Sequence, residues 1–197
     1  GLQIKGLTAC AGIAFVKSSF PFYYGYELAE SLCSAAKKVS KEIDSAYPPS
    51  SLMFHKVQDS FISDYDDISS RELRPNSKSS FKFGPYFLKG QKGYWAIAQL
   101  LSVSASLVGE EENAIRSNIR NWMSLLTQSD EVSAQRLDRI RAIHSNKDDL
   151  INMLTGYRVE AVKENGENIS LKVYPAYDVL AINTVKTQIT QTPKNGK

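Results

Sequence analysis

The sequence has few of the residues that usually hold metals or form disulfides. Its 197 residues include two cysteines and two histidines, too few for a disulfide framework. His55 and His144 show neither HxH nor HExxH spacing, so we expect no histidine-based zinc site and interpret His55 as structural. Cys10 and Cys33 have no basic neighbour in sequence and are interpreted as small buried apolar residues. This cysteine usage is typical of a reducing cytoplasm.

Long apolar runs and strong net charge are also lacking. No stretch approaches the ~20 apolar residues of a membrane span, and no signal peptide precedes the first strand, so we expect a cytoplasmic protein that makes no membrane contact. The formal net charge of +3 is too small to predict nucleic-acid binding by itself. The sequence begins with Gly1 rather than Met, and we expect a fragment of a longer protein.

Recognisable catalytic motifs are absent as well. The sequence contains no P-loop, no GxGxxG and no GxSxG. Asp64, Asp66 and Asp67 are carboxylates of the kind that bind Mg²⁺. On a helix, however, Asp66 and Asp67 would point about 100° apart, so we interpret the cluster as a solvated helix start. The residues alone thus predict no catalytic site, no metal site and no cofactor in this chain.

The first part of the chain predicts a strand–helix–strand unit. An apolar run over 7–16 reads as a buried strand, and Pro21 stands where a helix could begin. A single apolar stripe at intervals of three and four residues then predicts the helix. A second short strand is expected over 52–57. The stripe consists of Leu28, Leu32, Ala35, Ala36, Val39 and Ile43.

The rest of the chain predicts helices and then a hairpin. An Asn-Gly turn at 165–166 joins two strand-like segments, and a final strand is expected over 179–182. The fold class is therefore α+β: the α/β unit, a helical region and a C-terminal β-hairpin. The expected regions are 1–92 for the α/β unit, 93–155 for the helices, 156–185 for the hairpin and final strand, and 186–197 for a disordered tail.

Basic residues at helical spacing suggest two surfaces that could contact RNA or phosphate. Arg116 and Arg120 share one helix face, and Arg136 and Arg139 lie on the next helix. Guanidinium groups bind phosphate through paired hydrogen bonds. The same residues equally suit an ordinary solvated face paired with neighbouring acids. Both interpretations stay open at this point.

Several segments, in order, resemble a known family. Ala11-Gly12-Ile13-Ala14 is followed by Lys17, Pro21, Glu27-Leu28-Ala29 and Ala36-Lys37. This order is similar to the palm domains of the large subunit of type III CRISPR effector complexes. That subunit belongs to the polymerase/nucleotidyl cyclase superfamily. SLMFHKVQDSF and FKFGPYFLKGQKGYWAIAQLL continue the likeness, which covers roughly residues 5–130.

The resemblance implies a ferredoxin-like palm portion with an antiparallel sheet. Catalytic relatives carry a Gly-Gly-Asp-Asp hairpin upstream of the strand that corresponds to 7–16, and it holds two metal ions. This chain has no such hairpin. The resemblance therefore implies either a second, non-catalytic palm or the C-terminal half of a palm. In the intact protein, Mg²⁺ would belong with the hairpin.

The resemblance also suggests one contact residue. Lys37 occupies the place of a lysine that reaches nucleotide phosphates in the cyclases, and a flexible ammonium group suits that role. The alternative is a solvated lysine near a helix C-terminus. Cys10 stands where the family often has serine, which removes a hydroxyl hydrogen bond.

We therefore expect a non-catalytic palm-like domain of an intracellular CRISPR-like antiviral defence protein. It would have a structural or assembly role and could also bind a nucleotide. Its partners would be the missing N-terminal half, another subunit, RNA or nucleotide, or a second copy. One alternative is an active nucleotidyl cyclase whose catalytic hairpin lies upstream. The other is an RNA-binding module that uses the arginine faces.

Overall fold

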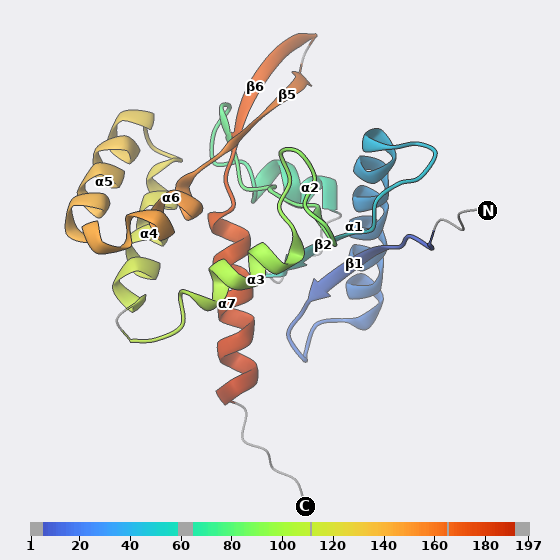
Figure 1. Cartoon of the computed structure of the whole chain (residues 1–197), viewed down its shortest axis with the longest axis horizontal. Helices are drawn as coiled ribbons and strands as arrows, with labels where there is room; N and C mark the ends of the chain where they lie inside the picture. Colours follow the sequence, from blue (N-terminus) through green and yellow to red (C-terminus); the bar gives the residue numbers. More distant parts are fainter. Residues whose placement is uncertain (1–5, 59–64, 111, 165, 192–197) are drawn as a thin grey trace, which may run out of the picture. The chain divides into compact units, whose positions relative to one another are not determined.

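The computed structural model describes residues 6–58, 65–110, 112–164 and 166–191, with side chains described up to 186. Helices alternate with short strands, which form two three-stranded sheets among these residues (Figure 1). The predicted α+β class is confirmed. The chain divides into two compact units, one of residues 1–66 and 84–100 and one of 67–83 and 101–197. Each is described separately below.

The first unit is a strand–helix–strand arrangement with one added strand. It contains β1 (Cys10–Phe15), α1 (Phe22–Ile43), β2 (Ser51–Lys56) and β4 (Tyr86–Phe87), with sheet order β1-β2-β4. β1 and β2 are parallel, and only β2 and β4 are antiparallel. The expected antiparallel sheet is therefore wrong for the β1–β2 pair. The crossover through α1 returns the chain to the same end of the sheet, so β2 runs in the direction of β1.

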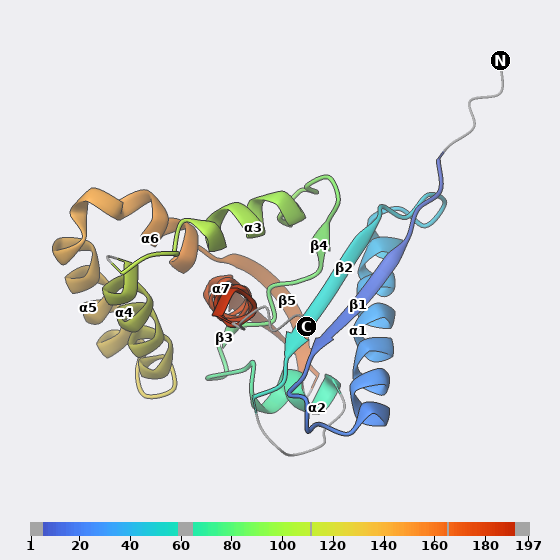
Figure 2. The same cartoon turned by 90° about the horizontal axis from the view of Figure 1, so that it is seen from below.

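Helix α1 forms where the apolar stripe predicts it. Pro21 precedes its first residue, and Asp44 ends it by accepting hydrogen bonds from the backbone N–H groups of Ala46 and Tyr47, both at 2.9 Å. The helix lies along both parallel strands (Figure 2). Its buried residues are four apart and mark the face packed on the sheet: Leu28, Leu32, Ala36 and Ser40.

Gly12 sets the distance between β1 and α1. A Cβ atom at this position would lie 1.9 Å from the carbonyl oxygen of Ala29 and 2.5 Å from the backbone nitrogen of Cys33. Both are backbone atoms of α1, so they cannot move aside as a side chain could. Only glycine allows this approach of helix to strand.

A small polar cluster lies beside Gly12 in the same interface. The hydroxyls of Ser40 and Ser51 are 2.7 Å apart, and Ser51 Oγ donates to Cys10 Sγ at 3.5 Å. The thiol of Cys33 donates to the carbonyl of Cys10 at 3.4 Å. Both cysteines are half-buried, and their side chains form part of the contact between β1 and α1.

We predict that Gly12→Ala lowers the free energy of unfolding by about 2–3 kcal/mol, because the added methyl forces α1 off the strand. Gly25→Ala is the matched control, since its Cβ would meet a Val16 methyl at an ordinary 3.7 Å. Alanine is also the better helix former there, so this variant should be neutral or stabilised by up to about 1 kcal/mol. Denaturant unfolding measures both, and equal midpoints for Gly12→Ala and wild type would contradict the packing.

The opposite face of this sheet carries aromatic side chains. The ring of Phe54 lies edge-on to Phe15 at 6.1 Å between centroids and stacks with Tyr86 at 5.7 Å. Phe54 and Tyr86 are buried. Towards the edge of the sheet the cover decreases, and Ile13 is 39% exposed.

The second unit is mainly helical and carries the hairpin. Helices α2 (Tyr65–Arg71) and α3 (Ile97–Ala105) each begin in the first unit and end in the second. β5 (Arg158–Glu164) and β6 (Glu167–Val173) form the predicted hairpin, and the two-residue β3 (Ser79–Ser80) pairs with β6. Residue 165 lies outside the described residues; Gly166 has φ +86°, as a hairpin turn favours. The remaining helices are α4 (Glu112–Leu125), α5 (Asp130–Ile143), α6 (Asp148–Thr155), a 3-10 turn (Ser145–Lys147) and α7 (Ala176–Gln191).

The final strand expected over 179–182 is wrong, because these residues belong to α7. Short apolar runs do not distinguish a strand from a buried helix, and Val179, Leu180 and Ala181 are all buried. Asn183 holds the helix in place by donating from Nδ2 to the carbonyls of Ser104 and Leu107, at 3.2 and 3.3 Å. The tail expected from 186 is helical as far as Gln191, and 192–197 lie outside the described residues.

The division into units differs from the expected boundary between residues 92 and 93. The first unit continues to Leu100, and residues 67–83 belong to the second unit. The pairing of β3 with β6 explains the second difference, since it joins Ser79 and Ser80 to Lys172 and Val173. Such long-range pairing leaves no mark in the local sequence.

Candidate functional site

β1 is an edge strand of the first sheet, because the strand order is β1-β2-β4. The N–H groups of Ser51 and Val57 donate to the carbonyls of Ala9 and Phe15, at 3.1 and 3.0 Å. Alternate residues of a parallel strand face its partner, so Gly12 and Ala14 direct their N–H and C=O groups away from β2. In the described part of the chain no strand pairs with this side of β1.

The composition of β1 differs from that of β5, the seven-residue edge strand of the second sheet. β1 reads CAGIAF, without charge or proline, whereas β5 reads RVEAVKE. Charged side chains on an edge strand oppose pairing with another chain. β5 carries this protection along its length and β1 does not. The first unit therefore presents a strand edge that chemically suits the addition of a further strand.

Lys37 lies on the solvent side of α1. It follows Ala36, which is fully buried, and its own side chain is exposed. Lys38 and Lys41 are exposed on the same half of the helix. The geometry leaves the ammonium group accessible to a phosphate from solvent, and phosphate binding by Lys37 stays a prediction.

Two of the four candidate arginines are used within the chain. Arg116 donates from Nη1 to the carbonyl of Leu107 and from Nη2 to the carbonyl of Gly109 and to Asn113 Oδ1, so it holds the turn before α4. Arg136 Nη2 donates to Asn118 Oδ1 at 2.7 Å. The structure therefore gives Arg116 and Arg136 intramolecular partners that the sequence did not indicate.

Arg120 and Arg139 are exposed. Asn118, between Arg116 and Arg120 on α4, also contacts His144: its Nδ2 lies 3.1 Å from His144 Nε2. The candidate surfaces thus reduce to one exposed guanidinium group on each of α4 and α5. Phosphate or RNA contact by any of the four arginines stays a prediction.

Residues that could hold a metal do not gather in the described ranges. No group of three His, Cys, Asp or Glu side chains is placed there to bind an ion. Asp66 and Asp67 are exposed in α2, and Asp64 lies outside the described residues. Within the same ranges, the helices are all too short or too polar to cross a membrane.

His55 is buried in β2, opposite Ala14 in the β1–β2 register. Burial lowers the pKa of His55 from 6.5 to about 4, because the protonated ring would lose its hydration. This agrees with the structural interpretation of His55.

We predict a loss of stability as the pH falls from about 6.5 to about 4, since the unfolded chain binds a proton there that the folded chain excludes. The difference in pKa corresponds to about 3 kcal/mol at its full extent. Urea unfolding at pH 7.5 and pH 4.5 measures it. In His55→Leu this part of the pH dependence should disappear. An unchanged difference between the two pH values in that variant would contradict the assignment.

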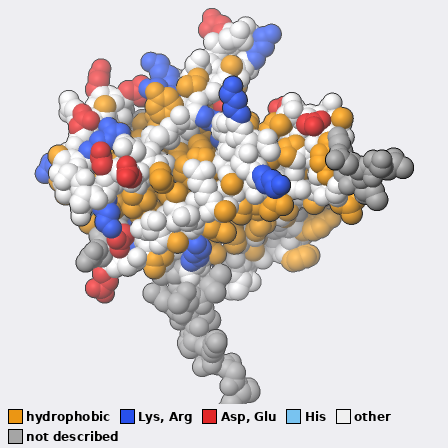
Figure 3. All heavy atoms as spheres, in the orientation of Figure 1, with side chains coloured by type: hydrophobic (Ala, Val, Ile, Leu, Met, Phe, Trp, Pro, Cys, Tyr) orange, Lys and Arg blue, Asp and Glu red, His pale blue; other side chains and the backbone are white. Residues whose placement is uncertain are grey.

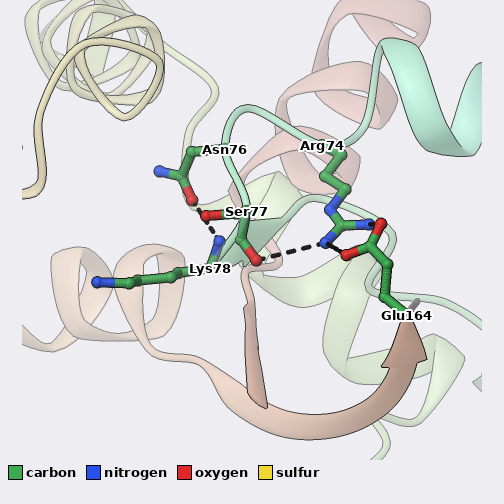
Figure 4. Close-up of polar contacts among 5 residues, drawn as sticks. All are labelled: Arg74, Asn76, Ser77, Lys78 and Glu164. Atoms are coloured by element: carbon green, nitrogen blue, oxygen red, sulfur yellow. Dashed lines mark hydrogen bonds and ion pairs between the residues drawn. The ribbon is translucent and has the colours of Figure 1, made fainter. Parts of the chain in front are cut away.

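A second feature, which sequence reasoning missed, fastens the hairpin (Figure 4). Arg74 Nη1 and Nη2 donate to Glu164 Oε1 and Oε2 at 2.9 and 2.7 Å, and Nη2 also donates to the carbonyl of Ser77 at 3.3 Å. Next to this pair, the side chain of Asn76 accepts from Lys78 N–H and donates to the carbonyl of Leu126. The loop that contains Arg74 therefore ties the hairpin end to the turn that follows α4.

We predict that Arg74→Ala speeds amide hydrogen exchange in Val162 and Glu164 several-fold relative to residues near the hairpin base, because the paired hydrogen bonds to the Glu164 carboxylate are lost. Arg74→Lys, which keeps the charge but not the paired geometry, should be intermediate. The hydrogen bond from Arg74 lowers the pKa of Glu164. In wild type, the Arg74–Glu164 pair should therefore weaken as the pH falls below the ordinary pKa range of a carboxyl group. Equal exchange in all three proteins would show that the pair does not hold the hairpin.

No protein-family model and no curated protein matches this chain.

Proposed function

We propose that this chain is a non-catalytic, palm-like assembly domain of an intracellular CRISPR-like antiviral defence protein. The observation that carries the proposal is the open, uncharged edge of β1. A strand from another part of the protein, or from another subunit, would pair there and extend the sheet.

The order of elements supports this assignment. The small-residue strand, the Pro21 loop and the helix with Ala36-Lys37 occur in the order that the palm resemblance implies. The parallel pairing of β1 with β2 departs from the antiparallel palm sheet that the resemblance implies. A further strand at the β1 edge would supply the neighbours that a full palm requires.

The exposed face of β1 supports the same proposal. Parallel strands usually have both faces covered, and α1 covers only one face of β1. On the other face Ala11 and Ile13 are exposed. An added strand would cover the edge and bring side chains across this face.

We predict that the amide protons of Gly12 and Ala14 exchange quickly in this chain alone and at least about 100-fold more slowly in the complete protein or its complex, since strand pairing buries them in hydrogen bonds. Hydrogen-exchange NMR or mass spectrometry measures both states. Ala14→Pro should weaken assembly and leave the β1–β2 ladder intact, because the N–H it removes faces outward.

Ala14→Gly keeps that N–H and is the control; it should assemble as wild type does. Unchanged exchange at Gly12 and Ala14 in the complete protein would refute the strand-addition proposal.

The cyclase alternative concerns the same strand. A Gly-Gly-Asp-Asp hairpin upstream would pair beside β1 and make the intact protein catalytic, with Lys37 as a phosphate contact. Assays of the complete protein with nucleoside triphosphates and Mg²⁺ distinguish the two. Cyclic or oligomeric nucleotide product would replace the non-catalytic assignment.

A further inference from the structure

Helix α1 presents a second surface, on the side away from the sheet. Positions spaced alternately four and three residues apart form one line along its outer face, the spacing of a helix that pairs with another helix. All of them are exposed, and the buried residues Leu28, Leu32 and Ala36 lie on the opposite side. We call this line the outer seam; it consists of Tyr23, Glu27, Glu30, Ser34, Lys37 and Lys41.

Charge is segregated along the outer seam. Its N-terminal half is acidic and its C-terminal half is basic. The helix dipole does not explain this, because its effect is confined to the end turns, where α1 has no acidic residue and only Lys41 as a basic one. Lys37 and Lys41, four apart, repel each other within the helix.

Most charged side chains of the outer seam have no ion-pair or hydrogen-bond partner among the described residues of the same copy. In the described part of the chain, the side chains of Glu30, Lys37 and Lys41 make no ion pair or hydrogen bond. Glu27 accepts a hydrogen bond from Tyr23, which raises the pKa of Tyr23. The seam is therefore available to a partner.

The charges of the outer seam are complementary to those of a second outer seam that runs in the opposite direction. We propose that α1 pairs with α1 of a second copy, antiparallel and about a two-fold axis between Glu30 and Ser34. Glu27 then faces the partner's Lys37, and Tyr23 faces the partner's Lys41. Glu30 faces the partner's Ser34, whose small side chain lets the helices approach and whose hydroxyl can donate to the carboxylate.

Each of these pairings is chemically favourable. Carboxylate and ammonium groups attract each other, and an ammonium group is attracted to an aromatic ring. Two-fold symmetry repeats every contact. Because exposed ion pairs are individually weak and screened by salt, the dimer should be weak and salt-sensitive.

Other partners fit the seam less well. Glu27 and Glu30 would repel RNA phosphates. The outer seam also has no aliphatic side chain that could insert into a lipid bilayer or an apolar groove. Hydrophobic side chains gather instead over the N-terminal end of α1 (Figure 3), where Phe22 and Tyr26 are 86% and 57% exposed. In the antiparallel pair this end lies near the C-terminal lysines of the partner.

The pairing does not depend on the proposed strand addition, because the seam lies on the face of α1 away from the sheet. Sedimentation velocity tests it at about 1 mM protein, where interactions of millimolar affinity become visible. Wild type should show a dimer at low salt and mostly monomer in about 0.5 M NaCl.

Charge reversal provides the decisive comparison. Glu27→Lys alone and Lys37→Glu alone should each be monomeric, since each would place like charges together twice in its own dimer. An equimolar mixture of the two variants should form a heterodimer, because every ion pair is then restored. The double variant Glu27→Lys/Lys37→Glu should dimerise as wild type does. Circular dichroism and thermal unfolding establish that each variant is folded.

Several results would overturn the proposal. One is a monomeric wild type at low salt; another is a mixture of the two single variants that stays monomeric. The mixture of Lys41→Glu with Glu27→Lys is the control for the register. If this mixture formed a heterodimer and the mixture of Lys37→Glu with Glu27→Lys did not, the stated pairing would be refuted. All of these outcomes leave the hydrogen exchange of Gly12 and Ala14 unaffected, so failure here is separate from failure of the strand-addition proposal.

Discussion

The first unit depends on the contact between the backbone of β1 and the backbone of α1 at Gly12. A Cβ atom there would collide with two backbone atoms of the helix, so the contact exists only because this residue has none. Backbone-to-backbone packing leaves little space for adjustment. It fixes the height of α1 above the sheet and, with Leu32 and Ala36 fully buried beneath the helix, its rotation.

That close approach explains why small side chains fill the rest of the interface. Cys10, Ser40 and Ser51 lie where larger residues would separate the helix from the strands, and their hydroxyl and thiol groups satisfy one another. A buried hydroxyl without such a partner would be costly. Cys10 thus supplies a small, weakly polar group that accepts the hydrogen bond from Ser51.

Local pattern was sufficient to predict some elements and not others. The stripe from Leu28 to Ile43 identifies α1, and the Asn-Gly pair marks the hairpin, because both signals lie within a few residues. The pairing of Arg74 with Glu164 joins segments 90 residues apart, and Arg74 resembles any surface arginine in sequence. The apolar run 179–182 fits a strand or a helix equally well, and only its packing among buried residues of the second unit decides for α7.

For the same reason, sequence patterns predict which helix face each candidate site residue occupies but not its partners. Lys37 is exposed as any lysine near a helix C-terminus would be, so its position adds little to the resemblance. Arg116 and Arg136 have the spacing of basic helix faces, yet their hydrogen bonds go to backbone carbonyls and to two asparagine side chains of the same chain. Spacing predicts which face a residue occupies. It does not predict whether a turn carbonyl lies within reach of that face.

The two proposed surfaces follow from one constraint. With α1 fixed by Gly12, a rotation of the helix by one residue would turn charged side chains towards the sheet, at the cost of desolvating them. The outer seam must therefore point to solvent in every copy of the chain, with the same charges at the same height. A surface held this rigidly needs little ordering when it binds, which favours even weak contacts. The edge of β1 is held by the same packing, so strand addition and helix pairing would use two different sides of one rigid element pair.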